Sequence, residues 1–206
     1  MNNGNDTYIW RTGDMPLMPG TAFSTKRTWE ILRPKEQTVV WTKAVWFGGH
    51  VPKHAFNFWV ASLDRLPVRA RLFSWGVAQT NACCTCDNHS ETRDHLLLHC
   101  EFSSEVLYLV LHRLGMPRLL FVDWSTLLSW LLSHSSPSSS TKLKRLVAHT
   151  TIYMLWRERN NRLHNSSSAT AAEIFKMIDR SVRDTLLARR KRKAFANLLS
   201  LWFTYA

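Results

Sequence analysis

The residues with the clearest chemistry are the four cysteines of the chain, which all lie within residues 83–100. Cys83 and Cys86 have the C-x2-C spacing with which two thiolates bind one ion from a tight turn. His95 and Cys100 follow as H-x4-C, so their side chains can return to the same point from a short helix and the turn after it. Three cysteines and one histidine leave no coordination position for water, and they therefore predict one structural zinc ion, Zn2+, rather than a catalytic one.

Other residues of the same stretch leave the ligand assignment open. Cys84 is an alternative, but its spacing to Cys86 is cramped, and a buried small residue or a spare thiol explains it better. His89 and His99 are alternative nitrogen ligands; we prefer His95, because the three leucines after it predict a short buried helix that fixes its direction. Disulfides are disfavoured, because adjacent cysteines would pair under strain and the polar N-terminus has no secretory h-region.

Positive charge is concentrated towards the C-terminus. The 206-residue chain has a net charge of +12, and residues 141–193 carry 14 Lys/Arg against 4 Asp/Glu, whereas residues 1–140 are nearly neutral. A basic segment on a near-neutral body predicts a polyanionic partner, namely nucleic acid, although a solvated helical face and a nuclear import signal are alternatives. The predicted contacts are Arg157, Arg159, Arg162, Arg189, Arg190, Lys191, Arg192 and Lys193.

The pattern of apolar residues and breakers predicts a mainly α-helical fold with a small N-terminal β-hairpin and a CCHC-type zinc knuckle, followed by basic C-terminal helices. Hairpin strands are predicted at residues 8–11 and 21–24. Helices are predicted at residues 26–32, 52–63, 69–75, 103–114, 124–132, 141–164 and 170–202. The uncompensated charge block at residues 189–193 is predicted to interrupt the last of them. The predicted organisation is a disordered tail (1–6), a zinc-binding domain (7–132), a Ser-rich linker (133–140) and a basic helical region (141–206).

Several motifs, weak singly but specific in their order, resemble the zinc-binding domain found downstream of the polymerase in plant non-LTR (LINE-type) retrotransposon reverse transcriptases. The resemblance covers roughly residues 8–114. It rests on Phe23-Ser24, Trp41, Val45-Trp46-Phe47, Val51-Pro52-Lys53-His54-Ala55-Phe56, Trp59, Arg65-Leu66-Pro67, Arg71-Leu72, Trp75-Gly76, Glu91-Thr92, Asp94-His95-Leu96 and the cysteine spacing. Residues 156–162, Trp-Arg-Glu-Arg-Asn-Asn-Arg, also look like a segment that trails this domain.

This resemblance implies that Cys83, Cys86, His95 and Cys100 are the zinc ligands. The family usually has a small hydroxyl residue where this chain has Val68, so the next helix is expected to lack its side-chain cap. The sequence has no Asp-Asp pair for a polymerase, no carboxylate constellation for two-metal nuclease chemistry, and no phosphate-loop or dinucleotide fingerprint. The chain is therefore expected not to be an enzyme.

The function expected from these features is nucleic-acid binding, to RNA or single-stranded DNA, by a non-catalytic zinc module derived from a retrotransposon reverse transcriptase. The alternatives are a zinc-stapled structural or protein-interaction module, with a reverse transcriptase polymerase domain as a partner, and a degenerate retroelement remnant. No apolar run approaches the length of a membrane span, and no small-molecule substrate is expected. An intracellular location is expected, with the nucleus favoured over the cytoplasm.

Overall fold

A computed structural model describes residues 24–34, 39, 41–117, 121–133 and 138–204. It divides the chain into two units, Met1–Val39 and Val40–Ala206, and each is described by itself. In the first unit, helix α1 spans Thr25–Leu32 and confirms the helix predicted over residues 26–32. The predicted tail and the predicted hairpin, except for its last residue, lie outside the described residues.

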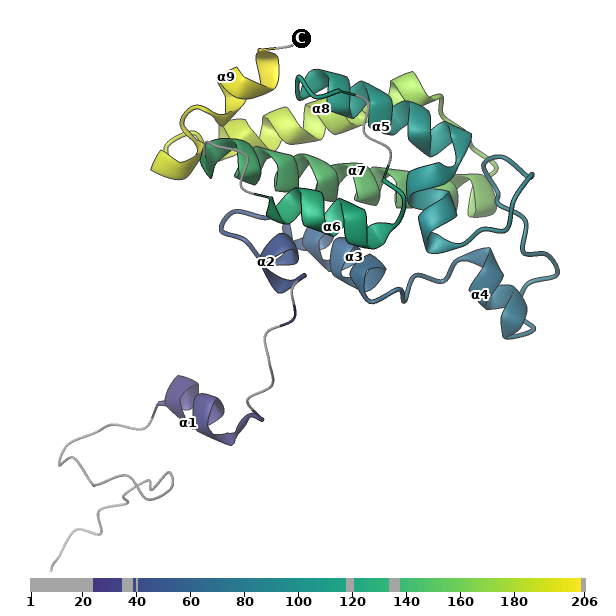
Figure 1. Ribbon diagram of the computed structural model, residues 1–206, viewed down its shortest axis with the longest axis horizontal. Coiled ribbons are helices and arrows are strands. Elements are labelled where there is room, and N and C mark those ends of the chain that lie inside the picture. The colour runs from purple at the N-terminus through teal and green to yellow at the C-terminus, as the bar shows by residue number, and fades with distance from the viewer. Residues whose placement is uncertain (1–23, 35–38, 40, 118–120, 134–137, 205–206) are drawn as a thin grey trace, which may run out of the picture. The chain divides into compact units, whose positions relative to one another are not determined.

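The second unit is built around one long helix, α7, which spans Ser138–His164 (Figure 1). The helices that contact it are α3 (Pro52–Ser62), α5 (Glu101–Arg113), α6 (Trp124–Leu132), α8 (Ala171–Ala188) and α9 (Leu198–Phe203). Leu146, Ile152 and Leu155 of α7 are all nearly fully buried, and they lie on different sides of the helix. A helix that is apolar on several sides suits this interior position.

Shorter elements complete the unit. They are α2 (Thr42–Val45), α4 (Arg69–Ser74), the π-helix η1 (His95–His99) and the 3-10 helix η2 (Lys193–Phe195). The described residues contain no strand, and their one β pairing is an isolated antiparallel bridge between Ala82 and Ser90. The mainly helical fold class is therefore confirmed.

Local signals explain where several helices begin. Pro52 occupies the first turn of α3, where its missing N–H is tolerated. Asp123 and Thr126 form a reciprocal capping box at the start of α6, and Thr170 and Glu173 form another at the start of α8. These caps place both helix starts within one residue of the predicted positions.

The long helix predicted over residues 170–202 is interrupted at the predicted charge block. α8 ends at Ala188, and the cationic residues 189–193 form a turn in which Arg192 has an extended backbone (φ −83°, ψ 125°). Like charges at helical spacing repel one another, which disfavours a continuous helix here. The turn also lets Phe195 enter the core, where it is 3% exposed.

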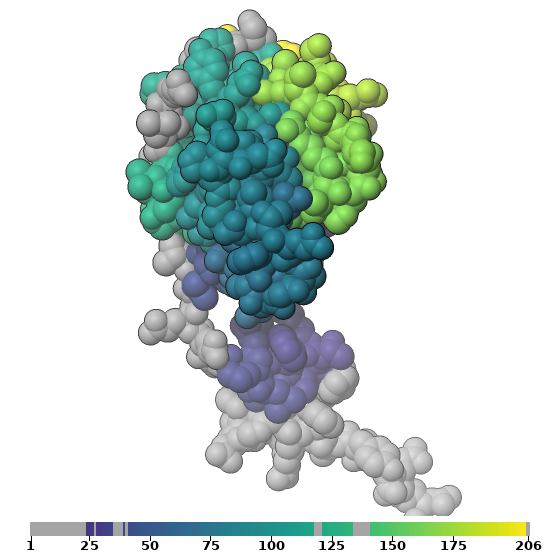
Figure 2. All heavy atoms as spheres, turned by 90° about the vertical axis from the view of Figure 1, so that its right-hand side faces the viewer, coloured from purple at the N-terminus to yellow at the C-terminus, as the bar shows by residue number. Residues whose placement is uncertain are grey.

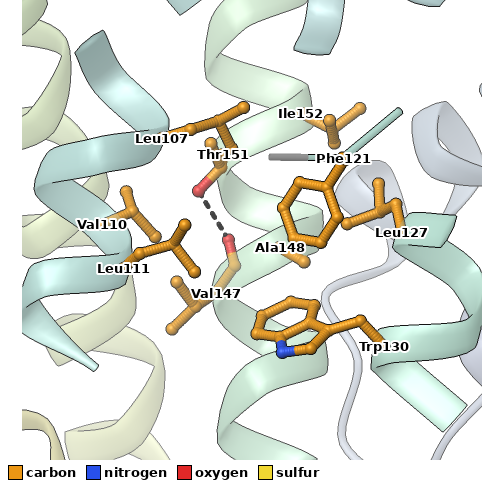
Figure 3. A pocket seen from close by; sticks show the side chains of 10 residues that line it. All are labelled: Leu107, Val110, Leu111, Phe121, Leu127, Trp130, Val147, Ala148, Thr151 and Ile152. Carbon is orange, nitrogen blue, oxygen red and sulfur yellow. Dashed lines mark hydrogen bonds between the residues drawn. The ribbon is translucent and has the colours of Figure 1, made fainter. Parts of the chain in front are cut away.

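The predicted domain boundaries stay a prediction, but the helices on both sides of residues 133–140 share one core. α3, α5 and α6 precede this segment and α8 and α9 follow it, and all five pack on α7. A small cavity of about 20 Å³ lies within this core, between α5, α6 and α7 (Figure 3). It is lined by apolar atoms and has room for about one water molecule, so it is a packing gap rather than a ligand site.

Two buried histidines join α7 to α2 and α3, since His54 Nδ1 of α3 also lies 3.3 Å from Thr150 Oγ1 of α7. His54 and His149 are each 1% exposed, and His149 Nε2 lies 3.1 Å from the carbonyl oxygen of Ala44, to which it donates. Burial lowers the pKa of His54 to about 4, assisted by the charge of Lys53. Burial also lowers the pKa of His149 to about 3, despite the hydrogen bond to Ala44. Both imidazoles are therefore neutral in the folded protein at pH 7.

Stability is expected to fall as the pH drops from 7 to 5. The unfolded histidines bind protons near pH 6.5, whereas the folded ones do so only near pH 4 and 3, so the unfolded state holds more protons in this interval. The loss is expected to be about 2 kcal/mol for each histidine. Urea unfolding followed by circular dichroism at several pH values measures it, with metal content monitored alongside because acid also protonates thiolates.

A matched pair of substitutions tests whether the buried histidines cause this pH dependence. His149→Gln keeps an amide that can donate to Ala44 but does not titrate, so the fall in stability between pH 7 and 5 should be halved. His112→Gln changes an exposed histidine and should leave the fall unchanged. An equal pH dependence in wild type and His149→Gln would contradict the assignment.

Candidate metal centre

The first two cysteines lie in a tight turn that folds back on itself. Outside the turn, the N–H of Glu91 donates to the carbonyl of Asn81 (2.8 Å), and the N–H of Cys83 donates to the carbonyl of His89 (2.8 Å). Inside it, Asp87 has a positive φ of 56°, and its N–H donates to the Cys83 carbonyl (2.8 Å). These bonds place both thiols of the C-x2-C pair on one side of the turn.

The other two side chains come from η1. His95 begins this π-helix and Cys100 follows its end, and the N–H of Cys100 donates to the carbonyl of His95 at 2.6 Å. In a π-helix the N–H of one residue bonds to the carbonyl five residues earlier, and this spacing brings His95 and Cys100 to the same side. The leucines at 96–98 are 1%, 0% and 5% exposed, so the helix is anchored in the core. The short buried helix predicted after His95 is therefore confirmed.

The four predicted side chains converge. Their candidate ligand atoms, Sγ of Cys83, Cys86 and Cys100 and one ring nitrogen of His95, all lie within 4.8 Å of one another. Cys86 Sγ lies 3.3 Å from His95 Nε2. Since zinc binds sulfur at about 2.3 Å, the ligand atoms of a tetrahedral site are separated by about 3.8 Å. The cluster is therefore compatible with one structural zinc ion, because each ligand atom needs to move only slightly to reach tetrahedral geometry.

One residue of the cluster was missed by sequence reasoning. The hydroxyl of Thr85 lies 2.9 Å from Cys83 Sγ and 3.0 Å from Cys100 Sγ, so it bridges the two buried sulfurs. A hydroxyl donor stabilises thiolate charge without being a ligand. The C-x2-C spacing carries no signal for this role, because either intervening residue could have faced the site.

The sulfurs strongly influence one another. The Cys83 thiol donates to Cys100 Sγ, which together with burial raises the pKa of Cys83 to about 12. The same hydrogen bond lowers the pKa of Cys100 to about 7, against the effect of burial. Without a metal, Cys83 therefore keeps its proton at pH 7, whereas Cys100 is partly ionised. A divalent cation favours the thiolate form of both, so metal binding here releases protons.

The alternative ligands lie outside the cluster. Cys84 is half-buried with its Sγ 3.8 Å from the carbonyl of Arg159, and burial raises the pKa of its thiol to about 12. His89 is exposed, with its ring centroid 5.0 Å from that of His95. His99 Nε2 lies 3.0 Å from the carbonyl oxygen of Phe121, away from the sulfurs. The geometry therefore favours the predicted register.

A buried carboxylate fastens the knuckle to the helices. Glu91 is 0% exposed and accepts hydrogen bonds from Arg159 Nη2 (2.7 Å) and Nε (3.1 Å) of α7. It also accepts from the N–H of Cys84 (3.2 Å) and of Arg69 (2.8 Å). Burial acts to raise the pKa of Glu91, but Arg159 and the two backbone donors outweigh it and lower this pKa overall.

The same carboxylate replaces a helix cap. Val68 precedes α4 and makes no side-chain cap, as expected from the sequence. The first N–H of α4, that of Arg69, is bonded to Glu91 Oε1 instead. One side chain thus links the knuckle, α4 and α7. Figure 2 shows the resulting end of the second unit, where the blue-teal knuckle region lies beside yellow-green α8.

Residues 23–106 match the family model described as zinc-binding in reverse transcriptase. The matched segment runs from α1 into α5 and includes all four converging side chains. The family is a zinc-binding domain and not a polymerase domain. No curated protein and no solved structure matches the chain. The family match and the Cys3His cluster together agree with one structural zinc at this site.

The predicted phosphate contacts fall into two groups. Arg159 is 2% exposed and held by Glu91, so its burial leaves no guanidinium surface for a phosphate, which corrects its assignment. Arg162 is partly buried and bonded to Glu158 Oε1 (2.7 Å) and the carbonyl of Thr85 (3.4 Å). Both arginines support the knuckle from α7, a role that the sequence reasoning missed.

All but one of the remaining predicted contacts face solvent. Arg157 is exposed on α7, and residues 190–193 are exposed in the turn after α8, called the basic turn below. Arg189 is partly buried and donates to the carbonyl of His50 at 3.1 Å, which fixes the start of the turn. None of residues 190–193 forms an ion pair with a carboxylate among the described residues. No helix in the described part of the chain has the length and apolarity to cross a membrane.

Proposed function

We propose that this chain is a non-catalytic, zinc-stapled module that binds nucleic acid, RNA or single-stranded DNA, through its basic C-terminal surface. The observation that carries the proposal is the basic turn, whose four exposed cations at residues 190–193 have no carboxylate partner among the described residues. Cations held close together and unpaired attract phosphates and release counterions from them. The family match supports a reverse transcriptase as the origin of the module, and a plant LINE-type element is part of the proposal.

In this proposal the zinc centre and the basic turn have separate roles. The knuckle contacts α7 near Arg159, whereas Lys142, near the other end of α7, lies 5.1 Å from the ring of Phe195 just after the turn. At 1.5 Å per residue these points of α7 are about 25 Å apart. In Figure 1 the segment after α4 and the segment after α8 lie near opposite ends of α7. The ligands Cys83, Cys86, His95 and Cys100 would thus order the domain without touching phosphates at the turn.

Binding to a labelled single strand is expected to weaken steeply with salt. Each phosphate contact contributes about 0.7 to the slope of log affinity against log salt for single strands. Lys191→Gln/Arg192→Gln should therefore reduce the slope by about 1.4. Fluorescence anisotropy over a salt series measures this, with zinc-loaded protein throughout.

A variant of equal charge provides the control. Lys176→Gln/Arg180→Gln removes two exposed cations of α8, outside the basic turn, and should leave the slope unchanged. Equal reductions in both variants would contradict a specific role of the basic turn. Absence of salt-dependent binding in wild type would overturn the proposed function.

A protein-interaction role is the second candidate, favoured by apolar side chains at the end of α4. Phe73, Trp75 and Val77 are 49%, 64% and 71% exposed. Such a patch beside the knuckle would suit a protein surface, and a polymerase domain is the partner expected from the family match. Binding that persists at high salt and is lost in Trp75→Ser would favour this role.

A further inference from the structure

A groove of about 550 Å³ lies between α3, residues 66–72 and α7. Its walls include Phe56 of α3, Trp156 of α7 and Leu72 of α4. Phe56 lines the groove and is 57% exposed. Flat aromatic walls in an open groove suit a flat, partly apolar ligand.

Two amide side chains are among the residues that line the groove. Asn57 is only 9% exposed, and its Oδ1 has no hydrogen-bond partner among the described residues. Asn160, on the opposite wall, accepts a hydrogen bond from Arg159 through its Oδ1. A buried acceptor without a donor is costly, so a ligand N–H group that reaches Asn57 would be favoured.

The rim of the groove is cationic. α3 and α4 contain no acidic residue, and the one acid of α7, Glu158, is 2% exposed and paired with Arg162. Lys53 lies one turn before Phe56 on α3, with its Nζ 5.3 Å from the ring centroid of Tyr153. Arg157 is exposed and, by helical spacing, shares a face of α7 with groove residues at 160 and 164.

We propose that the groove binds an unpaired base of a single-stranded nucleic acid, an inference that rests on the proposed function and gives it a second contact site. The base stacks on Phe56 and Trp156, and its exocyclic amino group donates to Asn57. The phosphates on either side lie near Lys53 and Arg157. Stacking on aromatic side chains beside cations is how proteins hold single strands. An apolar peptide would leave the buried amide unpaired and gain nothing from the cations.

The test compares two single strands of about twelve nucleotides, within the range of site sizes for such contacts. One is a fluorescein-labelled oligodeoxycytidylate, whose bases carry an amino donor, and the other has the same backbone with abasic sites throughout. Binding to the full zinc-loaded chain is measured by anisotropy at one salt concentration. Wild type should bind the base-bearing strand about tenfold more tightly or better, since each stacked base contributes appreciably.

Substitutions test whether the preference for the base-bearing strand arises in the groove. Phe56→Ala should remove most of the tenfold preference, and Asn57→Leu, which keeps the side-chain size, should reduce it several-fold. Phe203→Ala changes a comparably exposed phenylalanine (44%) on α9, outside the groove, and should keep it.

Two outcomes would overturn the inference in different ways. Equal affinity of wild type for both strands, or an unchanged preference in Phe56→Ala, removes the groove site but leaves the proposed function intact. Failure of wild type to bind either strand removes the proposed function and the groove site with it.

Discussion

Replacing Cys100 with serine is expected to lower the free energy of unfolding by more than about 4 kcal/mol, which is the range for loss of a structural metal. Cys100 is 0% exposed and lies at the end of η1, between the knuckle and α5. Without its thiolate, the turn around Cys83 and Cys86 has few apolar contacts to order it. Chemical unfolding followed by circular dichroism measures the loss, and excess chelator should produce the same loss in wild type.

Hydrogen exchange should place the effect in the knuckle. The amides of Cys83, Glu91 and Cys100 are hydrogen-bonded within the described structure and should lose protection first. Cys84→Ser is the control, because that thiol lies outside the cluster, and its cost should be about 1 kcal/mol or less. An unfolding midpoint that chelator leaves unchanged would contradict a stabilising role for the metal.

Replacing Arg159 with methionine is expected to destabilise the protein by about 3–5 kcal/mol, because it leaves a buried carboxylate without its charged partner. Glu91 is 0% exposed, and Arg159 Nη2 lies 2.7 Å from its Oε1. The two backbone donors at Arg69 and Cys84 remain, so the loss of stability should lie near the lower end of this range. Denaturant unfolding at pH 7 with saturating zinc measures it.

Arg157→Met is the matched control on the same helix. Arg157 is exposed, so its loss should change stability by about 0.5 kcal/mol or less. The two variants remove the same charge, and only burial distinguishes them. If Arg159→Met were as stable as Arg157→Met, the link between knuckle and α7 would contribute nothing to stability.

The link explains how a zinc ion can stabilise more than its own loop. Glu91 lies between the last cysteine of the turn and η1 in sequence, and its carboxylate reaches α4 and α7 as well. Arg162 adds a second tie, from α7 to the carbonyl of Thr85 in the same turn. Order in the knuckle is therefore coupled to the helices that carry the groove and, at the far end of α7, the basic turn.

Local interactions made much of this structure predictable from the sequence. The helices of the second unit follow from apolar spacing, prolines and caps, and the start of α6 was predicted to the residue. The metal cluster was predictable for a similar reason, since ligand spacing over 18 residues restricts which side chains can meet. The break at residues 189–193 was indicated by its run of cations, although such a run is compatible with both helix and turn, and the burial of Phe195 favours the turn.

Contacts between distant segments were not predictable. Glu91 and Arg159 are 68 residues apart, and nothing in either local sequence indicates that they pair or that both are buried. The assignment of Arg159 to phosphate binding failed for this reason, because charge alone does not distinguish an arginine at the surface from one inside. The groove beside α3 likewise depends on how α3, α4 and α7 meet.

The most direct test of the account is the zinc content of the purified, chelator-free chain, measured by native mass spectrometry for wild type, Cys83→Ser, Cys84→Ser and His95→Ala. The account predicts one zinc per chain in wild type and in Cys84→Ser, and loss of zinc in the other two. Absence of zinc from folded wild type would contradict the metal centre. Loss of zinc in Cys84→Ser with retention in Cys83→Ser would contradict the ligand register and with it the role given to Thr85.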